Sequence, residues 1–171
     1  MYQRVETPQA IDLMPAGLFL MTAAHEGRDN WQFVVRGLGI TAGPPTIVVV
    51  GLSPRNLTTQ LADASGEFVL AVCSTAQAPI VARSRGLTGR EVEDKFAVVG
   101  LQRLPATQVK APLIADAHAC LECRIQGKFP AGDRQMYVAE VVALHYDPSC
   151  PPVVHYDHRV YRFLSEATLL G

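Results

Sequence analysis

The sequence is short of charge: Asp, Glu, Lys and Arg make up only 18% of its 171 residues, and the net charge is −1. Its densest basic cluster, Arg83–Arg90, is too sparse to form a surface for nucleic acid or an anionic membrane. So little surface charge favours an oligomer, in which a second subunit covers part of the surface.

A long hydrophobic segment is also missing. The longest apolar run near the N-terminus, Met14–Ala24, is far shorter than the roughly 20 residues of a transmembrane helix. It follows a polar segment of mixed charge, unlike the start of a signal peptide. We therefore expect a cytoplasmic protein whose four cysteines are reduced thiols.

The motifs of several enzyme classes are absent. No GxSxG, P-loop, HExxH or GxGxxG stands in a suitable context, so hydrolase, NTPase and Rossmann functions have no support. Cys120 and Cys123 fit CxxC, but an alternating strand sends these two positions to opposite faces, so we expect no metal or dithiol site. No repeat or linker divides the chain, which predicts a single domain over 1–171 with 1–14 as an N-terminal arm.

The hydrophobic pattern predicts mainly β structure. Thr46–Leu52 is expected to be buried on both faces and Ala119–Lys128 on one, and turn residues at Glu26–Asn30 indicate a hairpin. Helical patterns follow Ser53 and cover Ala76–Arg85. About seven or eight strands, mostly in hairpin order, with two or three short helices predict an antiparallel barrel. The other expected strands are Leu18–Ala24, Trp31–Ile40, Glu67–Cys73, Met136–Tyr146, Val153–Tyr156 and Arg159–Leu164.

The helix after Thr46–Leu52 has clear signals at both ends. Ser53 or Asn56 is suited to cap its N-terminus, and Gly66 ends it. Its apolar residues fall on one stripe, which consists of Leu57, Leu61 and Ala64.

The start of that helix has the composition of a phosphate site. Free backbone N–H groups lie there beside the hydroxyls of Ser53, Thr58 and Thr59 and the charge of Arg55. Most helices begin with such residues and bind nothing, so the pattern alone leaves both interpretations open.

A second cationic segment covers the loop Gly86–Gly89 and the polar helical turn Arg90–Phe96. The segment brings together a hydroxyl at Thr88 and cations at Arg85, Arg90 and Lys95, and it is able to close over a phosphorylated ligand. The alternative is a solvated helix face on which Glu93 and Asp94 neutralise the cations.

The order of motifs resembles the flavin reductase-like, FMN-binding split-barrel family, which includes flavoredoxin. The likeness runs from about residue 15 to residue 165, and it is the order and spacing of the motifs that are specific. They are LMTAA at Leu20–Ala24, the turn at Gly27–Asn30, PPTIVVV at Pro44–Val50, RNLT at Arg55–Thr58, GEF at Gly66–Phe68, GREVEDKF at Gly89–Phe96, APLI at Ala111–Ile114, LEC at Leu121–Cys123, Gly132–Asp133, Glu140–Val141 and Tyr161.

The resemblance implies a homodimer of antiparallel split β-barrels with FMN at or near the interface, reduced by NADH or NADPH. By the same resemblance, Asn30 and the backbone near Arg36 are expected to border the isoalloxazine ring, and Tyr161 is expected to cover one edge. Lys95 is expected to approach the flavin or its phosphate. No acid–base catalytic residue is required, because the flavin carries the chemistry. The residues implied to hold the phosphate are Ser53, Arg55, Asn56, Thr58 and Thr59.

Two positions depart from the family pattern. Arg36 stands where flavoredoxin-like members tend to have an aromatic residue, and Arg134 stands where some have histidine. An arginine changes the polarity of the pocket. Two alternatives to a reductase remain, an FMN-holding electron carrier fed by another protein and a flavin-free binding protein on the same barrel.

Overall fold

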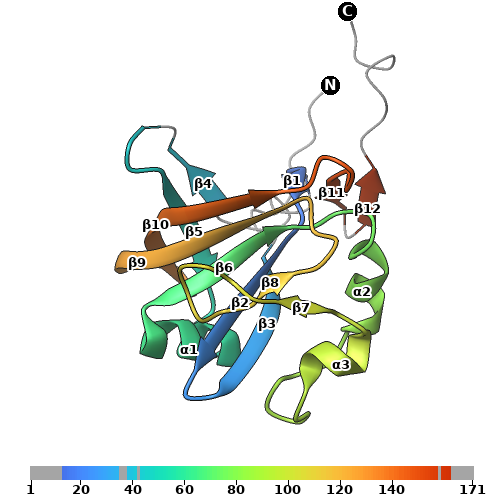
Figure 1. Ribbon diagram of the computed structural model, residues 1–171, viewed down its shortest axis with the longest axis horizontal. Coiled ribbons are helices and arrows are strands. Elements are labelled where there is room, and N and C mark those ends of the chain that lie inside the picture. The colour runs from blue at the N-terminus through green and yellow to red at the C-terminus, as the bar shows by residue number, and fades with distance from the viewer. Residues whose placement is uncertain (1–12, 35–37, 42, 158, 163–171) are drawn as a thin grey trace, which may run out of the picture.

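The computed structural model describes residues 13–34, 38–41, 43–157 and 159–162, and this part of the chain is built around a seven-stranded antiparallel sheet (Figure 1). The strand order in that sheet is β3-β2-β6-β9-β10-β5-β4. Its strands are β2 (Phe19–His25), β3 (Arg28–Val34), β4 (Leu38–Ile40), β5 (Ile47–Leu52), β6 (Glu67–Val72), β9 (Ala119–Ala131) and β10 (Arg134–Tyr146).

Two smaller sheets and three short helices complete the described part. One sheet has the order β1-β11-β12 and the other pairs β7 with β8. The remaining elements are β1 (Ala16–Gly17), β7 (Arg103–Leu104), β8 (Leu113–Ile114), β11 (Val153–Tyr156), β12 (Arg159–Arg162), α1 (Leu57–Ser65), α2 (Ala78–Arg83) and α3 (Lys95–Val99). No helix in the described ranges is long and apolar enough to cross a membrane.

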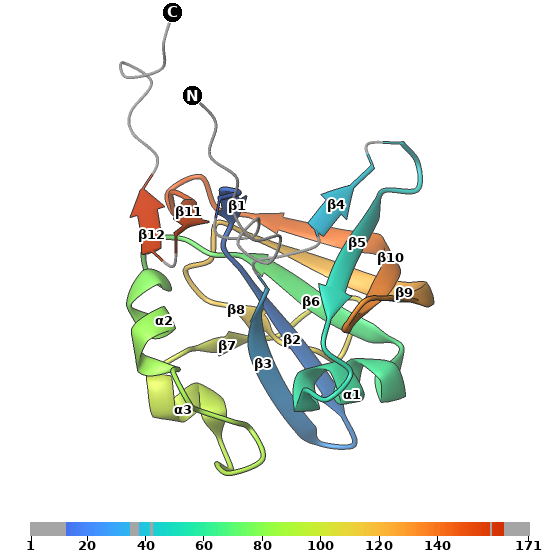
Figure 2. The same ribbon diagram turned by 180° about the vertical axis from the view of Figure 1, so that it is seen from behind.

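The large sheet curls so that β5 approaches β3, and α1 packs against β2, β3 and β6 (Figure 2). One hydrophobic cluster fills the inside of the curl and includes Leu61 of α1 and Phe68 of β6. A second cluster lies on the other face, where Ile80 of α2 and Phe96 of α3 pack on Trp31 and its neighbours. The expected antiparallel barrel with two or three short helices is confirmed.

The first hairpin is tighter than predicted. His25 pairs with Arg28, and the two residues between them, Glu26 and Gly27, both have positive φ, of 48° and 78°. This is the twist that a two-residue hairpin needs. Asp29 and Asn30 therefore belong to β3 and not to the turn. The predicted strand Trp31–Ile40 was right over Trp31–Val34, which pairs with β2, and wrong for its last residues, since β4 pairs with β5 and not with β2.

The burial of two strands differs from expectation. β5 alternates between buried and half-buried residues, so it is not buried on both faces. β9 was expected to have one polar face, yet its first five residues are all buried, Glu122 included. Cys120 and Cys123 belong to different hydrophobic clusters, as their spacing in a strand predicted.

Helix α1 begins and ends as the sequence indicated. Asn56 is its N-cap residue, without a capping hydrogen bond from its side chain, and Gly66 ends it in the left-handed region at φ 75°. The predicted apolar stripe was wrong at Ala64, which is exposed. Two threonines, Thr58 and Thr59, are buried instead, because β3 supplies hydrogen-bond partners for their hydroxyls.

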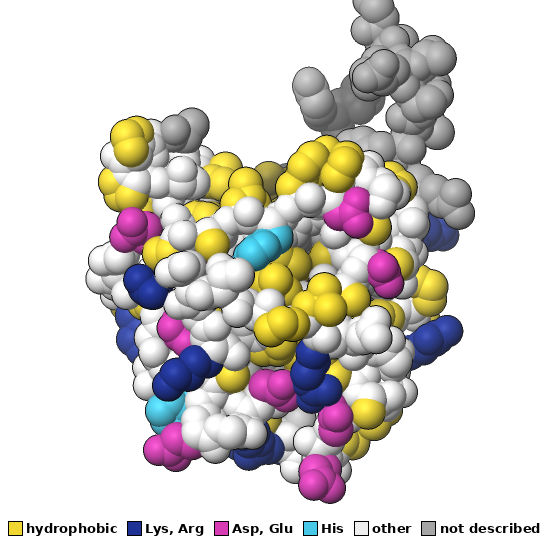
Figure 3. Space-filling view, in the orientation of Figure 1, with side chains coloured by type: hydrophobic (Ala, Val, Ile, Leu, Met, Phe, Trp, Pro, Cys, Tyr) yellow, Lys and Arg dark blue, Asp and Glu magenta, His cyan; other side chains and the backbone are white. Residues whose placement is uncertain are grey.

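The view of Figure 3 shows how charge is distributed on one face of the molecule. Hydrophobic side chains gather near the middle of this face, around β7 and β8, and charged side chains of both signs surround them. Leu104 of β7 is 45% exposed there.

Candidate functional site

A cavity of about 190 Å³ lies at the N-terminus of α1. It unites three segments that are distant in sequence: the centre of β3, the turn into α1 and the loop before α3. Its lining residues are Asn30, Trp31, Gln32, Arg55, Asn56, Leu57, Thr58, Leu87, Thr88, Gly89, Arg90 and Lys95.

Side-chain amides of β3 hold the first turn of α1. Asn30 donates to Thr58 Oγ1 at 3.0 Å, and Gln32 donates to Thr59 Oγ1 at 3.2 Å. Asn56 donates to Gln32 Oε1 at 2.6 Å. Thr58 Oγ1 accepts one hydrogen bond in this network, so its own hydroxyl proton is free to donate to a ligand in the cavity.

Lys95 reaches the cavity from the first position of α3. Its Nζ donates to the backbone oxygen of Trp31 at 2.9 Å and lies 4.1 Å from the centroid of the indole ring. Partial burial lowers the pKa of Lys95 from its ordinary value, because desolvation disfavours the ammonium ion. A bound anion would offset the desolvation cost of the ammonium ion, so Lys95 is suited to bind a negatively charged group.

The position of Lys95 depends on its neighbour Asp94. Asp94 caps α3 by accepting hydrogen bonds from the backbone N–H groups of Phe96 and Ala97. Arg103 bridges Asp94 and Asp29, with shortest contacts of 2.7 Å to each, and its guanidinium stacks on the Phe96 ring at 3.8 Å. The Arg103 hydrogen bond lowers the pKa of Asp94. Asp94 therefore pairs with Arg103 and not with the loop cations, which contradicts the alternative in which it neutralises them.

The loop Gly86–Arg90 lies directly against β3. A Cβ atom on Gly89 would stand 2.6 Å from Asn30 Cγ, so this position has no room for a side chain. Arg28 donates to the Gly89 backbone oxygen at 2.8 Å. The loop thus forms one wall of the cavity, as its cations suggested.

The charges around the cavity fit a phosphate. Arg55, Arg90 and Lys95 supply three cations, and the lining contains no Asp or Glu. The start of α1 adds free backbone N–H groups and the positive end of the helix dipole. Trp31 also lines the cavity, and its Nε1 is buried without a hydrogen-bond partner in the described part of the chain. The residues present therefore suit a phosphorylated ligand.

The sequence model of the flavin reductase like domain matches residues 11–165. The chain belongs to the flavin reductase-like family. It is accordingly an oxidoreductase of the NAD(P)H-dependent, flavin-reducing type, and its antiparallel barrel is the split barrel that the motif order implied.

Two curated relatives cover most of the chain. Actinorhodin polyketide dimerase of Streptomyces coelicolor is 27% identical over 92% of this chain and 85% of its own. NADH-dependent FMN reductase AsuE2 of Streptomyces nodosus subsp. asukaensis is 26% identical over 90% of this chain and 81% of its own. Among solved structures, NADH:FAD oxidoreductase SgcE6 of Streptomyces globisporus C-1027 has the same fold, with a TM-score of 0.84 at 20% identity over 96% of this chain and 99% of that one.

Not every residue that the family resemblance pointed to lies at the cavity. Ser53 and Thr59 are outside its lining, and Thr59 is fully buried against Gln32. Tyr161 lines a different, mainly apolar hollow together with Tyr156. Arg36 lies outside the described residues. The five that do meet in the cavity are Asn30, Arg55, Asn56, Thr58 and Lys95.

The structure adds site residues that the sequence analysis did not select. Gln32 of β3 forms hydrogen bonds with Thr59 and Asn56 at the start of α1, and the only sequence signal for it was its alternation with Trp31. Arg103 was missed because its partners, Asp29 and Asp94, are 74 and 9 residues away. Separations of this kind leave no local pattern.

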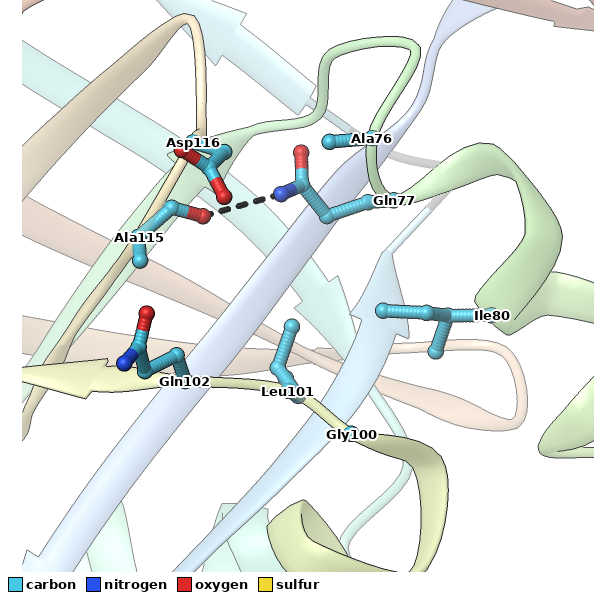
Figure 4. A pocket seen from close by; sticks show the side chains of 8 residues that line it. All are labelled: Ala76, Gln77, Ile80, Gly100, Leu101, Gln102, Ala115 and Asp116. Carbon is cyan, nitrogen blue, oxygen red and sulfur yellow. Dashed lines mark hydrogen bonds between the residues drawn. The ribbon is translucent and has the colours of Figure 1, made fainter.

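A larger hollow of about 390 Å³ lies between α2 and the segments after α3 and β8 (Figure 4). Gln77 donates to the backbone oxygen of Ala115 at one side of it, while Ile80 and Leu101 form an apolar wall. Asp116 is the one ionisable residue in its lining. A carboxylate without a cation repels phosphate, so the smaller cavity at α1 is the better candidate for the flavin phosphate.

Proposed function

We propose that the protein is an FMN-dependent reductase that takes electrons from NADH or NADPH and passes them to a free flavin or an acceptor protein. The observation that carries this proposal is the convergence of Arg55, Arg90 and Lys95 on a carboxylate-free cavity at the N-terminus of α1. Membership of the family indicates a flavin and the type of reaction, and the cavity offers a binding place for a terminal phosphate.

In this proposal the three cations and the start of α1 hold the phosphate dianion. Thr58 donates its hydroxyl to a phosphate oxygen, and Asn56 and Arg55 stand at the same helix start. Lys95 contributes its charge from the opposite wall. Ser53 and Thr59, which lie outside the lining, support this turn through the backbone and through Gln32.

When bound, the flavin supplies N5 as the hydride acceptor, so the protein has to bind and orient two ligands and needs no acid–base pair. We assign the border of the ring to Asn30 and to the backbone around Arg36, and one edge to Tyr161. Trp31 and the Gly86–Arg90 loop shield the phosphate end from water.

We further propose a homodimer that uses the outer face of β5 and β10. Val49 pairs with Val138, and Gly51 with Met136, on a face that is only half-buried, while the alternate pair of Val50 and Tyr137 is fully buried. A half-buried apolar face on two paired strands suits a second copy, in line with the low charge of the sequence. Light scattering combined with size-exclusion chromatography is expected to give twice the 18.5 kDa monomer mass.

The cysteines agree with a reducing compartment, and we propose the cytoplasm. All four are free thiols, three of them buried. Burial raises the pKa of Cys123 to about 12, which keeps that thiol protonated and unreactive.

An anaerobic titration tests the function. Purified protein is loaded with FMN, and NADH or NADPH is added while the oxidised-flavin absorbance is recorded. We expect rapid bleaching with at least one nicotinamide. Protein that binds FMN but stays yellow would be an electron carrier, and protein that takes up no FMN would be a flavin-free binding protein.

A further inference from the structure

Two arginines tie the Gly86–Arg90 loop across one end of the phosphate cavity. On the β3 side, Arg28 donates to the Gly89 backbone oxygen at 2.8 Å. On the α1 side, Arg90 donates to Gln60 Oε1 at 2.6 Å and to the Arg55 backbone oxygen at 3.4 Å. The loop is thereby joined to both walls.

The cavity behind this loop is small. It measures about 190 Å³. Sites that enclose a whole drug-sized ligand usually measure about 300–1,000 Å³. A cavity of this size holds one end of a flavin nucleotide, its phosphate, while the rest of the ligand lies outside it.

FMN and FAD differ at this end of the molecule. In FMN the phosphate is a terminal monoester with two negative charges, whereas in FAD it continues into an adenylate. That extension needs an exit past the phosphate. On the hairpin side of the cavity, Gly89 packs on Asn30 and Arg28 holds the loop, so this side is closed to an extension beyond the phosphate.

We propose that the tied loop makes the site selective for a flavin with a terminal phosphate over a flavin dinucleotide, and that the contact between Arg90 and Gln60 is the specificity-determining link. This inference rests on the proposed function, because it assumes that the cavity holds the flavin phosphate. The link acts by closing the end of the cavity through which an adenylate would leave.

Gln60 allows the link to be cut without removing charge from the site. It is exposed and lies outside the cavity lining, so Gln60→Ala releases Arg90 while the guanidinium stays available to the phosphate. Gln126→Ala is the matched control, since Gln126 is an exposed glutamine that donates to Glu140 at 3.0 Å, away from the cavity.

The test is calorimetric titration of apo wild type, Gln60→Ala and Gln126→Ala with FMN and with FAD, alongside thermal unfolding of each protein. We expect wild type and Gln126→Ala to bind FMN about tenfold or more tightly than FAD, a difference of roughly 1.4 kcal/mol. Loss of one exposed hydrogen bond is expected to reduce this preference by about threefold in Gln60→Ala, through tighter FAD binding.

Two results would overturn the inference and leave the reductase intact: equal affinity of wild type for the two flavins, or an unchanged preference in Gln60→Ala. Absence of binding by either flavin would instead overturn the proposed function, and the inference with it. The unfolding curves show whether each variant is folded at the temperature of the titration.

Discussion

Asn30 and Thr58 join β3 to the first turn of α1 through a buried hydrogen bond of 3.0 Å. The next pair along, Gln32 and Thr59, makes the equivalent contact at 3.2 Å. The two threonines are equally buried, yet only Thr58 lines the cavity. They allow a comparison between a hydroxyl that we propose contacts the ligand and one that supports the fold.

Replacing each threonine by valine separates these two roles. Thr58→Val is expected to weaken FMN binding by about 5- to 30-fold, because it removes one hydrogen bond to a dianion. Thr59→Val is expected to lower stability by a similar amount to Thr58→Val and to leave the FMN dissociation constant within about twofold, since its hydroxyl lies outside the cavity. Flavin titration and urea unfolding measure the two effects. Equal losses of affinity in both variants would place the phosphate elsewhere.

Lys95→Met keeps most of the length of the side chain and removes its charge. We expect FMN affinity to fall by about 10- to 100-fold, the range for a charge-assisted hydrogen bond. Lys110→Met, an exposed lysine outside the lining, serves as the control.

The pKa of Lys95 adds a pH dependence to that effect. Desolvation lowers this pKa in the folded protein, so the ammonium ion is lost before the pH reaches its ordinary value of 10.5. Wild-type affinity for FMN is therefore expected to begin falling below pH 10.5, while Lys95→Met shows no such fall. A parallel decline in both proteins would mean that another group titrates.

Arg103 is expected to act on flavin binding through Asp94 and Lys95. Arg103→Gln breaks the bridge between β3 and α3 and is expected to destabilise the fold by about 1–3 kcal/mol. FMN affinity should fall as well, although Arg103 does not line the cavity. Arg124→Gln, which loses an exposed contact to Gln108, is the control. An unaltered FMN affinity in folded Arg103→Gln would show that Lys95 keeps its position without the bridge.

Glu122 gives the fold an acid-sensitive contact away from the flavin site. Its fully buried carboxylate accepts hydrogen bonds from Thr107 and Val109 and lies 2.6 Å from His145 Nε2. Desolvation opposes ionisation, but the hydrogen bonds from Thr107 and His145 outweigh it and lower the pKa of Glu122 to about 2.

The lowered pKa of Glu122 fixes the sign of its effect on stability. The contribution is complete above the ordinary value of 4.5 and is lost as the pH falls toward 2. Glu122→Gln is expected to be about 2–4 kcal/mol less stable than wild type near neutral pH, because buried N–H donors lose their charged acceptor. Chemical unfolding at several pH values should show this gap narrowing below pH 4.5. A gap independent of pH would contradict the assignment.

The sequence predicted the parts of the site that rest on local rules. A capping residue at Asn56, the threonines behind it and Gly66 at the far end indicated α1 and the polar N-terminal end to which we assign the flavin phosphate. Alternation in β9 correctly separated Cys120 from Cys123. The order of motifs associated Lys95 with the start of α1, and Lys95 does line the cavity there, which spacing alone does not show.

Contacts between segments that are distant in sequence could not be predicted from local sequence patterns. The exposure of Ala64 and the burial of Thr58 depend on amides of β3, nearly 30 residues earlier. The burial of Glu122 depends on the loop at Thr107, which crosses over β9. The Arg103 bridge joins three elements at once. In each case tertiary hydrogen bonds decided which side of an element became the core.

The central claim is that the cavity at the start of α1 holds the flavin phosphate, and the most direct measurement compares FMN with riboflavin, which lacks that phosphate. We expect wild type to bind FMN far more tightly than riboflavin. In the double variant Thr58→Ala/Lys95→Ala, FMN binding is expected to weaken by about 2–4 kcal/mol while riboflavin binding hardly changes. Equal dissociation constants for FMN and riboflavin in the wild type would contradict the account.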